Sequence, residues 1–199
     1  MCCKNTVSPL IEQIQGGANR AQINKGWVMS SDIVSWFRYQ LKASGEGFIW
    51  ALQRMDTALY HRIPPAMKYL GEWPPLRHVW HVTEYERCIV LPSMKQWLGG
   101  PMPSEESWID DDAAWSRVKN QTSDDFVTAF QAVRQEQITL LTDLEAVDWA
   151  APHQTLWGVK PLIMVVTKTY QHTFEHGDTL LRMALWWHDI ERHILSTAE

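Results

Sequence analysis

The longest helical pattern in the chain occupies residues 161–192. Its apolar and small side chains recur at intervals of three and four residues, which is the spacing of one face of an α-helix. This segment therefore predicts a long amphipathic helix whose inward face packs against the rest of the fold. The residues of that face are Leu162, Val165, Val166, Thr169, His172, Thr173, His176, Leu180 and Met183.

Two helical patterns lie in the first half of the chain. The first covers residues 32–55, follows a pair of serines that can cap it, and stops at the prolines of HRIPP. The second lies within residues 72–103, where Pro74 and Pro75 suit a first helical turn and two glycines followed by proline suit the end. Pro92 falls inside this second pattern and is expected to kink it.

A third helical pattern precedes the long one. An acidic connection comes first, and the aspartates at 110–112 predict the start of a short helix better than a calcium loop, because the ligand spacing is absent. Ser123 or Asp124 can then cap a helix that runs to the break at WAAPH. We find no strand-like alternation of convincing length. The sequence therefore predicts an all-α protein built as a four-helix bundle.

Composition suggests a single domain with an aromatic core. The 199 residues suffice for one sizeable core. We expect residues 1–29 to form a loosely ordered N-terminal extension and residues 30–199 to form the bundle. The chain has 12 tryptophans, which we expect mainly as packing residues. Four of them could line a pocket or fill the core: Trp36, Trp80, Trp157 and Trp186.

Charge and cysteine content bear on partners and compartment. The formal net charge of −5 is unfavourable for binding nucleic acid or an anionic membrane surface. The three cysteines, Cys2, Cys3 and Cys88, have no disulfide-framework spacing, which suits a reducing compartment. The start of the chain lacks secretory features, and no apolar run is long enough to span a bilayer. We therefore expect a cytoplasmic protein with no membrane partner, and treat Cys2 and Cys3 as unmodified.

Two histidines on the long helix suggest a metal site. His172 and His176 are four residues apart on the inward face, so both imidazoles can reach one ion. Two ligands alone rarely hold a metal, and a third is needed from a facing helix. His81 shares a face of the second helix with Tyr85, whereas His78 is turned by about 60° from it. We therefore predict a metal site of His81, His172 and His176. The other histidines lie in connections or near the chain end: His61, His153, His188 and His193.

The same three histidines have a second interpretation without a metal. They could be buried imidazoles that hydrogen-bond to carbonyl groups or to hydroxyls, of which Thr83, Thr169 and Tyr170 are candidates. If a metal is bound, ligation by imidazoles alone suits zinc, nickel or copper and disfavours magnesium or calcium. Both interpretations remain open from the spacing.

Neighbouring residues suggest further roles and competing motifs. HTFEH has the form of the inverted zinc-protease motif, with Glu175 as base, but too few residues follow for that family's downstream ligand. A di-iron carboxylate site would need paired Glu-x-x-His motifs, which are absent. Glu84 and Glu175 each lie three residues from a predicted ligand and could orient it or act as a base. Cys88 is expected to be a packing thiol, because it lies two turns from His81.

Two motifs resemble those of a known family. WPPLRHVWHVTEYER is similar to the second-helix motif of the DinB-like (YfiT-like) superfamily, and LWGVKPLIMVVTKTYQHTFEHGDTL resembles its last-helix motif. The resemblance covers residues 30 to about 190, with the elements in the same order. It implies an up-down-down-up bundle with zinc or nickel on three histidines, which correspond to His81, His172 and His176.

The resemblance also implies a class of chemistry. Members of the family with assigned activity include S-transferases and isomerases that use low-molecular-weight thiols, and others are classed only as metal-dependent hydrolases. We therefore expect a metal-dependent thiol S-transferase or hydrolase that acts on a small molecule. The alternative is a non-catalytic bundle that binds metal or ligand in a structural or sensing role. Family habit and the excess of tryptophan are compatible with a homodimer.

Overall fold

The computed structural model describes residues 31–104 and 112–197. The expected extension, 1–29, and the aspartates at 110 and 111 lie outside the described residues. The helical elements are α1 (Ser31–Leu52), η2 (Thr57–Leu59), α2 (Met67–Leu70), α3 (Pro75–Tyr85), η3 (Glu86–Val90), α4 (Leu91–Lys95), η4 (Gln96–Leu98), α5 (Asp112–Val118), α6 (Ser123–Asp143) and α7 (Leu162–Thr197). Two short strands, β1 (Pro152–Thr155) and β2 (Gly158–Pro161), precede α7.

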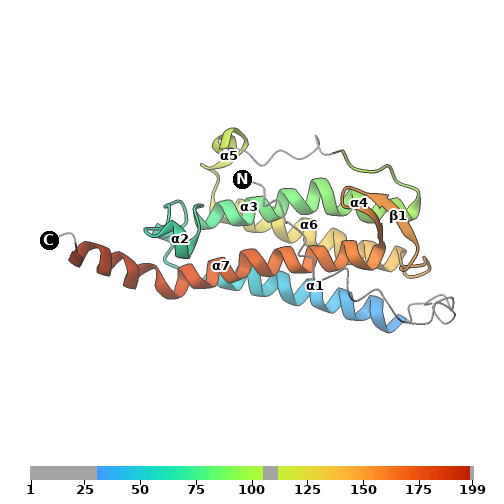
Figure 1. Cartoon of the computed structure of the whole chain (residues 1–199), viewed down its shortest axis with the longest axis horizontal. Helices are drawn as coiled ribbons and strands as arrows, with labels where there is room; N and C mark the ends of the chain where they lie inside the picture. Colours follow the sequence, from blue (N-terminus) through green and yellow to red (C-terminus); the bar gives the residue numbers. More distant parts are fainter. Residues whose placement is uncertain (1–30, 105–111, 198–199) are drawn as a thin grey trace, which may run out of the picture.

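The four long helical segments form an up-down-down-up bundle. Figure 1 shows that α1 and α7 run in one direction, whereas α6 and the segment from α3 to α4 run in the other. Helix α1 packs along α7 and α6, and α3 packs against α6 and α7. The predicted all-α bundle is therefore confirmed, and the α3–α7 contact brings together the two helices with the predicted metal ligands.

The second helix changes its winding at its middle. After α3 the chain makes a π-helical turn at Glu86–Val90 and then resumes as α4, which has Pro92 in its first turn. Proline has no N–H to donate to the carbonyl four residues before it, and its ring would clash with that carbonyl in a regular helix. The wider π turn accommodates this proline, so the expected disturbance takes the form of a π-bulge.

Two local predictions are corrected by the structure. The cap of α6 is Thr122, one residue before the predicted candidates, and its side chain and that of Asp125 form a reciprocal capping box. The segment before α7, where no strand was expected, forms an antiparallel hairpin in which Thr155 pairs with Gly158. Strands of four residues are too short to show the alternation of apolar and polar side chains. Gly158, which follows the turn between them, has a φ of 84°, a backbone conformation that favours glycine.

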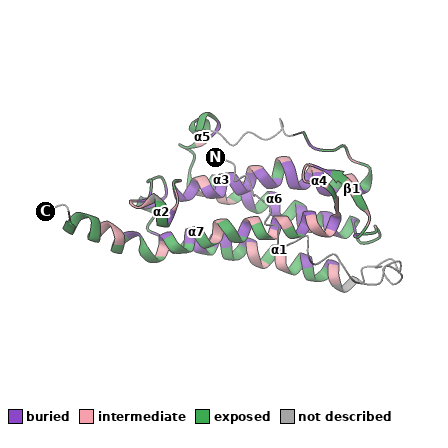
Figure 2. Cartoon of the chain, viewed as in Figure 1, coloured by how far each residue is buried: buried purple, intermediate pink, exposed green. Residues whose placement is uncertain are grey.

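The core consists of two apolar clusters stacked along the bundle. One contains Phe48, Trp80, Phe130 and Trp187, and the other contains residues such as Trp149. Figure 2 shows that the buried residues line the inner faces of the long helices. Among the described residues, no helix is long and apolar enough to cross a membrane.

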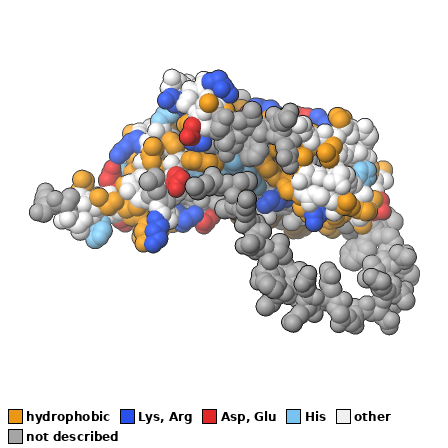
Figure 3. Space-filling model, turned by 45° about the horizontal axis from the view of Figure 1, so that its top comes forward, with side chains coloured by type: hydrophobic (Ala, Val, Ile, Leu, Met, Phe, Trp, Pro, Cys, Tyr) orange, Lys and Arg blue, Asp and Glu red, His pale blue; other side chains and the backbone are white. Residues whose placement is uncertain are grey.

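The tryptophans divide between the core and the surface. Trp80 is buried, as the packing interpretation expects, and Trp157 is partly buried. Trp36 and Trp186 are 49% and 52% exposed, so neither fills the core. Figure 3 shows that apolar side chains are exposed among acidic and basic ones on one face of the molecule.

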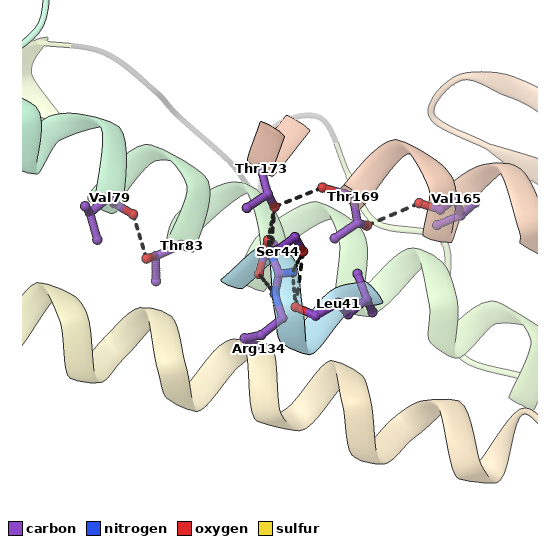
Figure 4. Close-up of polar contacts among 9 residues, drawn as sticks. Leu41, Ser44, Val79, Thr83, Arg134, Val165, Thr169 and Thr173 are labelled. Atoms are coloured by element: carbon purple, nitrogen blue, oxygen red, sulfur yellow. Dashed lines mark hydrogen bonds and ion pairs between the residues drawn. The ribbon is translucent and has the colours of Figure 1, made fainter. Parts of the chain in front are cut away.

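A buried polar network lies between the two apolar clusters. Arg134 of α6 donates hydrogen bonds to both carboxylate oxygens of Glu86, to the Thr173 hydroxyl at 2.7 Å, and to the Leu41 carbonyl at 2.8 Å. It also donates to the Ser44 hydroxyl at 3.0 Å (Figure 4). One side chain thus connects all four helical segments of the bundle, next to the turn of α7 that contains His172.

Candidate metal centre

Three histidines from α3 and α7 converge at the middle of the bundle. His81 Nε2 and His172 Nε2 lie 3.1 Å apart, and one ligand atom of each of His81, His172 and His176 lies within 4.8 Å of the others. The i, i+4 spacing in α7 puts two imidazoles on one face, and the packing of α3 against α7 supplies the third. The structure therefore brings together the three residues that the sequence predicts as ligands.

A fourth histidine joins this cluster. His78 Nδ1 and His176 Nδ1 lie 2.8 Å apart, a distance at which one ring N–H donates to the lone pair of the other ring. His78 is 5% exposed, although the sequence argument turned it away from the site. A rotation of 60° from the face of His81 still leaves His78 within the broad arc of α3 that faces α7, so the choice of His81 as third ligand stands beside a contact of His78 with His176.

One pair of nitrogens has the separation expected of two ligands on a divalent metal. Zinc–imidazole bonds of 2.0–2.1 Å with tetrahedral angles place two donors about 3.3 Å apart. The 3.1 Å between His81 Nε2 and His172 Nε2 is close to this separation. Among the described residues, Nδ1 of His172 has no hydrogen-bond partner, so ring contacts and Nε2 alone hold this imidazole. The three histidines could hold a metal ion, and the donor set suits zinc, nickel or copper.

Two of the hydroxyl groups proposed as partners in the metal-free alternative donate their protons to backbone carbonyls instead. Thr83 donates to the Val79 carbonyl at 2.7 Å and Thr169 donates to the Val165 carbonyl at 3.2 Å (Figure 4). Both hydroxyl protons are therefore used within their own helices. His172 hydrogen-bonds only to His81 within the described part of the chain.

The two glutamates considered for orienting or base roles are engaged on their own helices. Glu84 pairs with Arg87, and Glu175 accepts a hydrogen bond of 2.7 Å from Gln171. Cys88 is partly buried and packs against one apolar cluster. Burial and the nearby Glu84 carboxylate raise the pKa of its thiol, so Cys88 is a neutral packing residue rather than a thiolate nucleophile.

Aromatic rings enclose the imidazoles. The Trp73 ring stacks on His176 with centroids 6.1 Å apart and planes 11° from parallel, and it contacts His81 with centroids 4.9 Å apart. The Arg77 guanidinium lies over the Trp73 side chain, 4.6 Å from a ring centroid. Tyr85 packs on His172 with centroids 4.2 Å apart. Trp73 was not predicted as part of the site. The one sequence feature that could have indicated it is its position just before the prolines that begin α3.

Burial keeps His172 and His78 uncharged. It lowers the pKa of His172 to about 2, and the neighbouring His176 and His81 act in the same direction. Burial is also the main cause that lowers the pKa of His78 well below its usual value, and charge repulsion from His176 and His81 adds to it. Neutral rings have lone pairs available, as metal binding requires.

These shifts predict that acid destabilises the metal-free protein. His172 takes up a proton near pH 6.5 when unfolded but resists it when folded, so the unfolded state binds more protons below pH 6.5. This contribution to stability is present above pH 6.5 and should fall by up to about 1.4 kcal/mol per pH unit below it. Urea unfolding in chelator at pH 7.5 and 5.5 measures the loss. His172→Gln should show a smaller loss, and an equal loss in both proteins would contradict the assignment.

A comparison of the sequence with models of protein families identifies a family for the region that forms the bundle and contains the histidine cluster. A family model for the DinB superfamily matches residues 40–180, which is well over half of the chain. Comparisons with curated proteins and with solved structures gave no match. The matched region runs from α1 to α7 and includes all four histidines of the cluster. The chain therefore belongs to the DinB superfamily.

Proposed function

We propose that this protein is a metal-dependent enzyme that binds zinc or nickel through His81, His172 and His176. The observation that carries the proposal is the convergence of three imidazoles from two helices, with two Nε2 atoms 3.1 Å apart. Three neutral ligands leave a divalent ion its full charge, which would lower the pKa of a thiol or water and polarise an electrophile. A site with three protein ligands also leaves room for substrate.

The residues around the histidines suit a small-molecule reaction with an external thiol. Trp73 stacks on His176 and also contacts the rings of His78 and His81, so an aromatic surface adjoins the cluster. Burial raises the pKa of Tyr85, so its phenol stays protonated beside His172. Burial raises the pKa of the Cys88 thiol, which therefore stays protonated, and in this proposal the thiolate nucleophile comes from an external thiol. We favour thiol S-transfer over hydrolysis by family resemblance alone.

Metal content and turnover test this proposal together. Protein purified without a histidine tag should contain about one zinc or nickel ion per chain. The loaded protein should accelerate attack of a small monothiol on an aryl chloride, which forms a C–S bond and releases chloride and a proton. Chelator should abolish the acceleration and metal should restore it. A loaded protein that accelerates neither this reaction nor ester hydrolysis would favour the non-catalytic role.

A further inference from the structure

We infer that His78 is a positioning residue that orients His176 toward a bound metal from outside the ligand set. This inference rests on the proposed metal site and adds a fourth functional histidine to it. It starts from the 2.8 Å contact between His78 Nδ1 and His176 Nδ1. Because this contact engages Nδ1 of His176, a metal ligated by His176 would be held through Nε2.

The proton positions follow from this geometry. An imidazole that ligates through Nε2 has its proton on Nδ1, so His176 donates and His78 accepts through a lone pair on Nδ1. A neutral His78 then has its own proton on Nε2. A donor–acceptor contact of this kind fixes both the tautomer of the ligand and the direction of its ring, the role that carboxylates and carbonyl groups have in many metal sites.

The residues around His78 hold its ring in place beside His176. Its ring is 5% exposed, and Trp73 packs against it with centroids 5.4 Å apart. Its Nε2 faces the chain at Gly71, where an added Cβ would lie 3.9 Å away, and has no hydrogen-bond partner among the described residues. Gly71 adopts a φ of 87°, so the backbone there favours glycine and forms a close wall. His78 is thus packed with its Nδ1 edge toward His176.

This arrangement bears directly on whether the site is open. If His78 acts through His176, the metal retains three protein ligands and a position for substrate. If His78 instead ligates the metal, four imidazoles close the site, as in a structural centre. Among the described residues, His78 hydrogen-bonds to His176, whereas His81 and His172 hydrogen-bond to each other.

Three substitutions separate the positioning role from simple packing. His78→Leu retains bulk but removes the acceptor, and should weaken zinc binding 10- to 100-fold. His78→Asn places an amide oxygen near the position of Nδ1, and should restore affinity to within about threefold of wild type. His78→Gln has the same amide one methylene further out, nearer to Nε2, and should not restore it. His61→Asn, in an exposed connection, is the matched control.

The measurements are zinc affinity by competition with a chromophoric chelator and the imidazole count by X-ray absorption on the wild type. Circular dichroism and thermal unfolding establish that each variant is folded. We expect three imidazole ligands in the wild type. Zinc affinity should be highest in the wild type, slightly lower in His78→Asn, and lowest in His78→Gln and His78→Leu. Equal affinity in all His78 variants, or four imidazoles in the wild type, would overturn the inference. A wild type that binds no metal would instead refute the proposed function, so the two failures are distinguishable.

Discussion

Replacing Arg134 by methionine is expected to lower the free energy of unfolding by about 3–5 kcal/mol. Arg134 and Glu86 form an ion pair whose side chains are 5% and 1% exposed. Removing the guanidinium leaves a buried carboxylate without its cation and removes the hydrogen bonds to the Leu41 carbonyl and to Ser44 and Thr173. The loss is large because the remaining polar groups stay out of reach of water.

Chemical unfolding of the metal-free protein measures this effect. Lys95→Met is a matched control, because it breaks a 3.0 Å ion pair with Glu136 whose side chains are 48% and 54% exposed. This control should change stability by about 1 kcal/mol or less. The double variant Glu86→Leu with Arg134→Met should recover much of the loss, since it leaves no buried charge. A loss for Arg134→Met no larger than for Lys95→Met would show that the buried pair does not hold the helices together.

Replacing His172 by alanine is expected to reduce bound metal to roughly a tenth or less of the wild-type content, because two ligands rarely retain an ion. His81→Ala and His176→Ala should do the same, since each removes one of the three converging donors. Elemental analysis of untagged protein after passage over chelating resin gives the metal-to-chain ratio. His188→Ala, which changes an exposed histidine on the same helix, should retain the metal.

Metal-dependent stability provides a second measurement on the same variants. A ligand that binds only the folded state stabilises it by about 2.7 kcal/mol at 100 times its dissociation constant. Added zinc should therefore raise the unfolding temperature of the wild type and of His188→Ala. It should leave His172→Ala nearly unchanged. Undiminished metal content in His172→Ala would refute the proposed ligand set, and the histidines would then be core residues.

The comparison of prediction with structure shows where local patterns suffice. The 3.6-residue period placed the long helices, since the periodicity of apolar side chains reports the buried face directly. The same period put His172 and His176 on one face of α7. The short hairpin before α7 escaped prediction, because strands of four residues contain too few alternations to be distinguished from a turn. The cap of α6 was misplaced by one residue, as is common where several polar residues adjoin.

The candidate site shows where local patterns fail. His78 and His81 are both on the α3 surface that meets α7, and only the packing of the two helices showed that both imidazoles reach the cluster. Trp73 lies outside any helix, so no periodicity predicted its stacking on His176. Arg134 would be expected at the surface from its charge, yet it is 4% exposed, because Glu86 and Thr173 come from other helices to satisfy it.

The sequence by itself determined the all-α class, the course of the long helices and the histidine pair of α7, because these depend on interactions within a few residues along one helix. The tertiary structure alone decided how α3 is set against α7. That arrangement brings His81 Nε2 to 3.1 Å from His172 Nε2 and places His78 behind His176. The physical reason is that helix register and rotation are set by packing and by buried polar bonds from distant segments, which no local pattern contains.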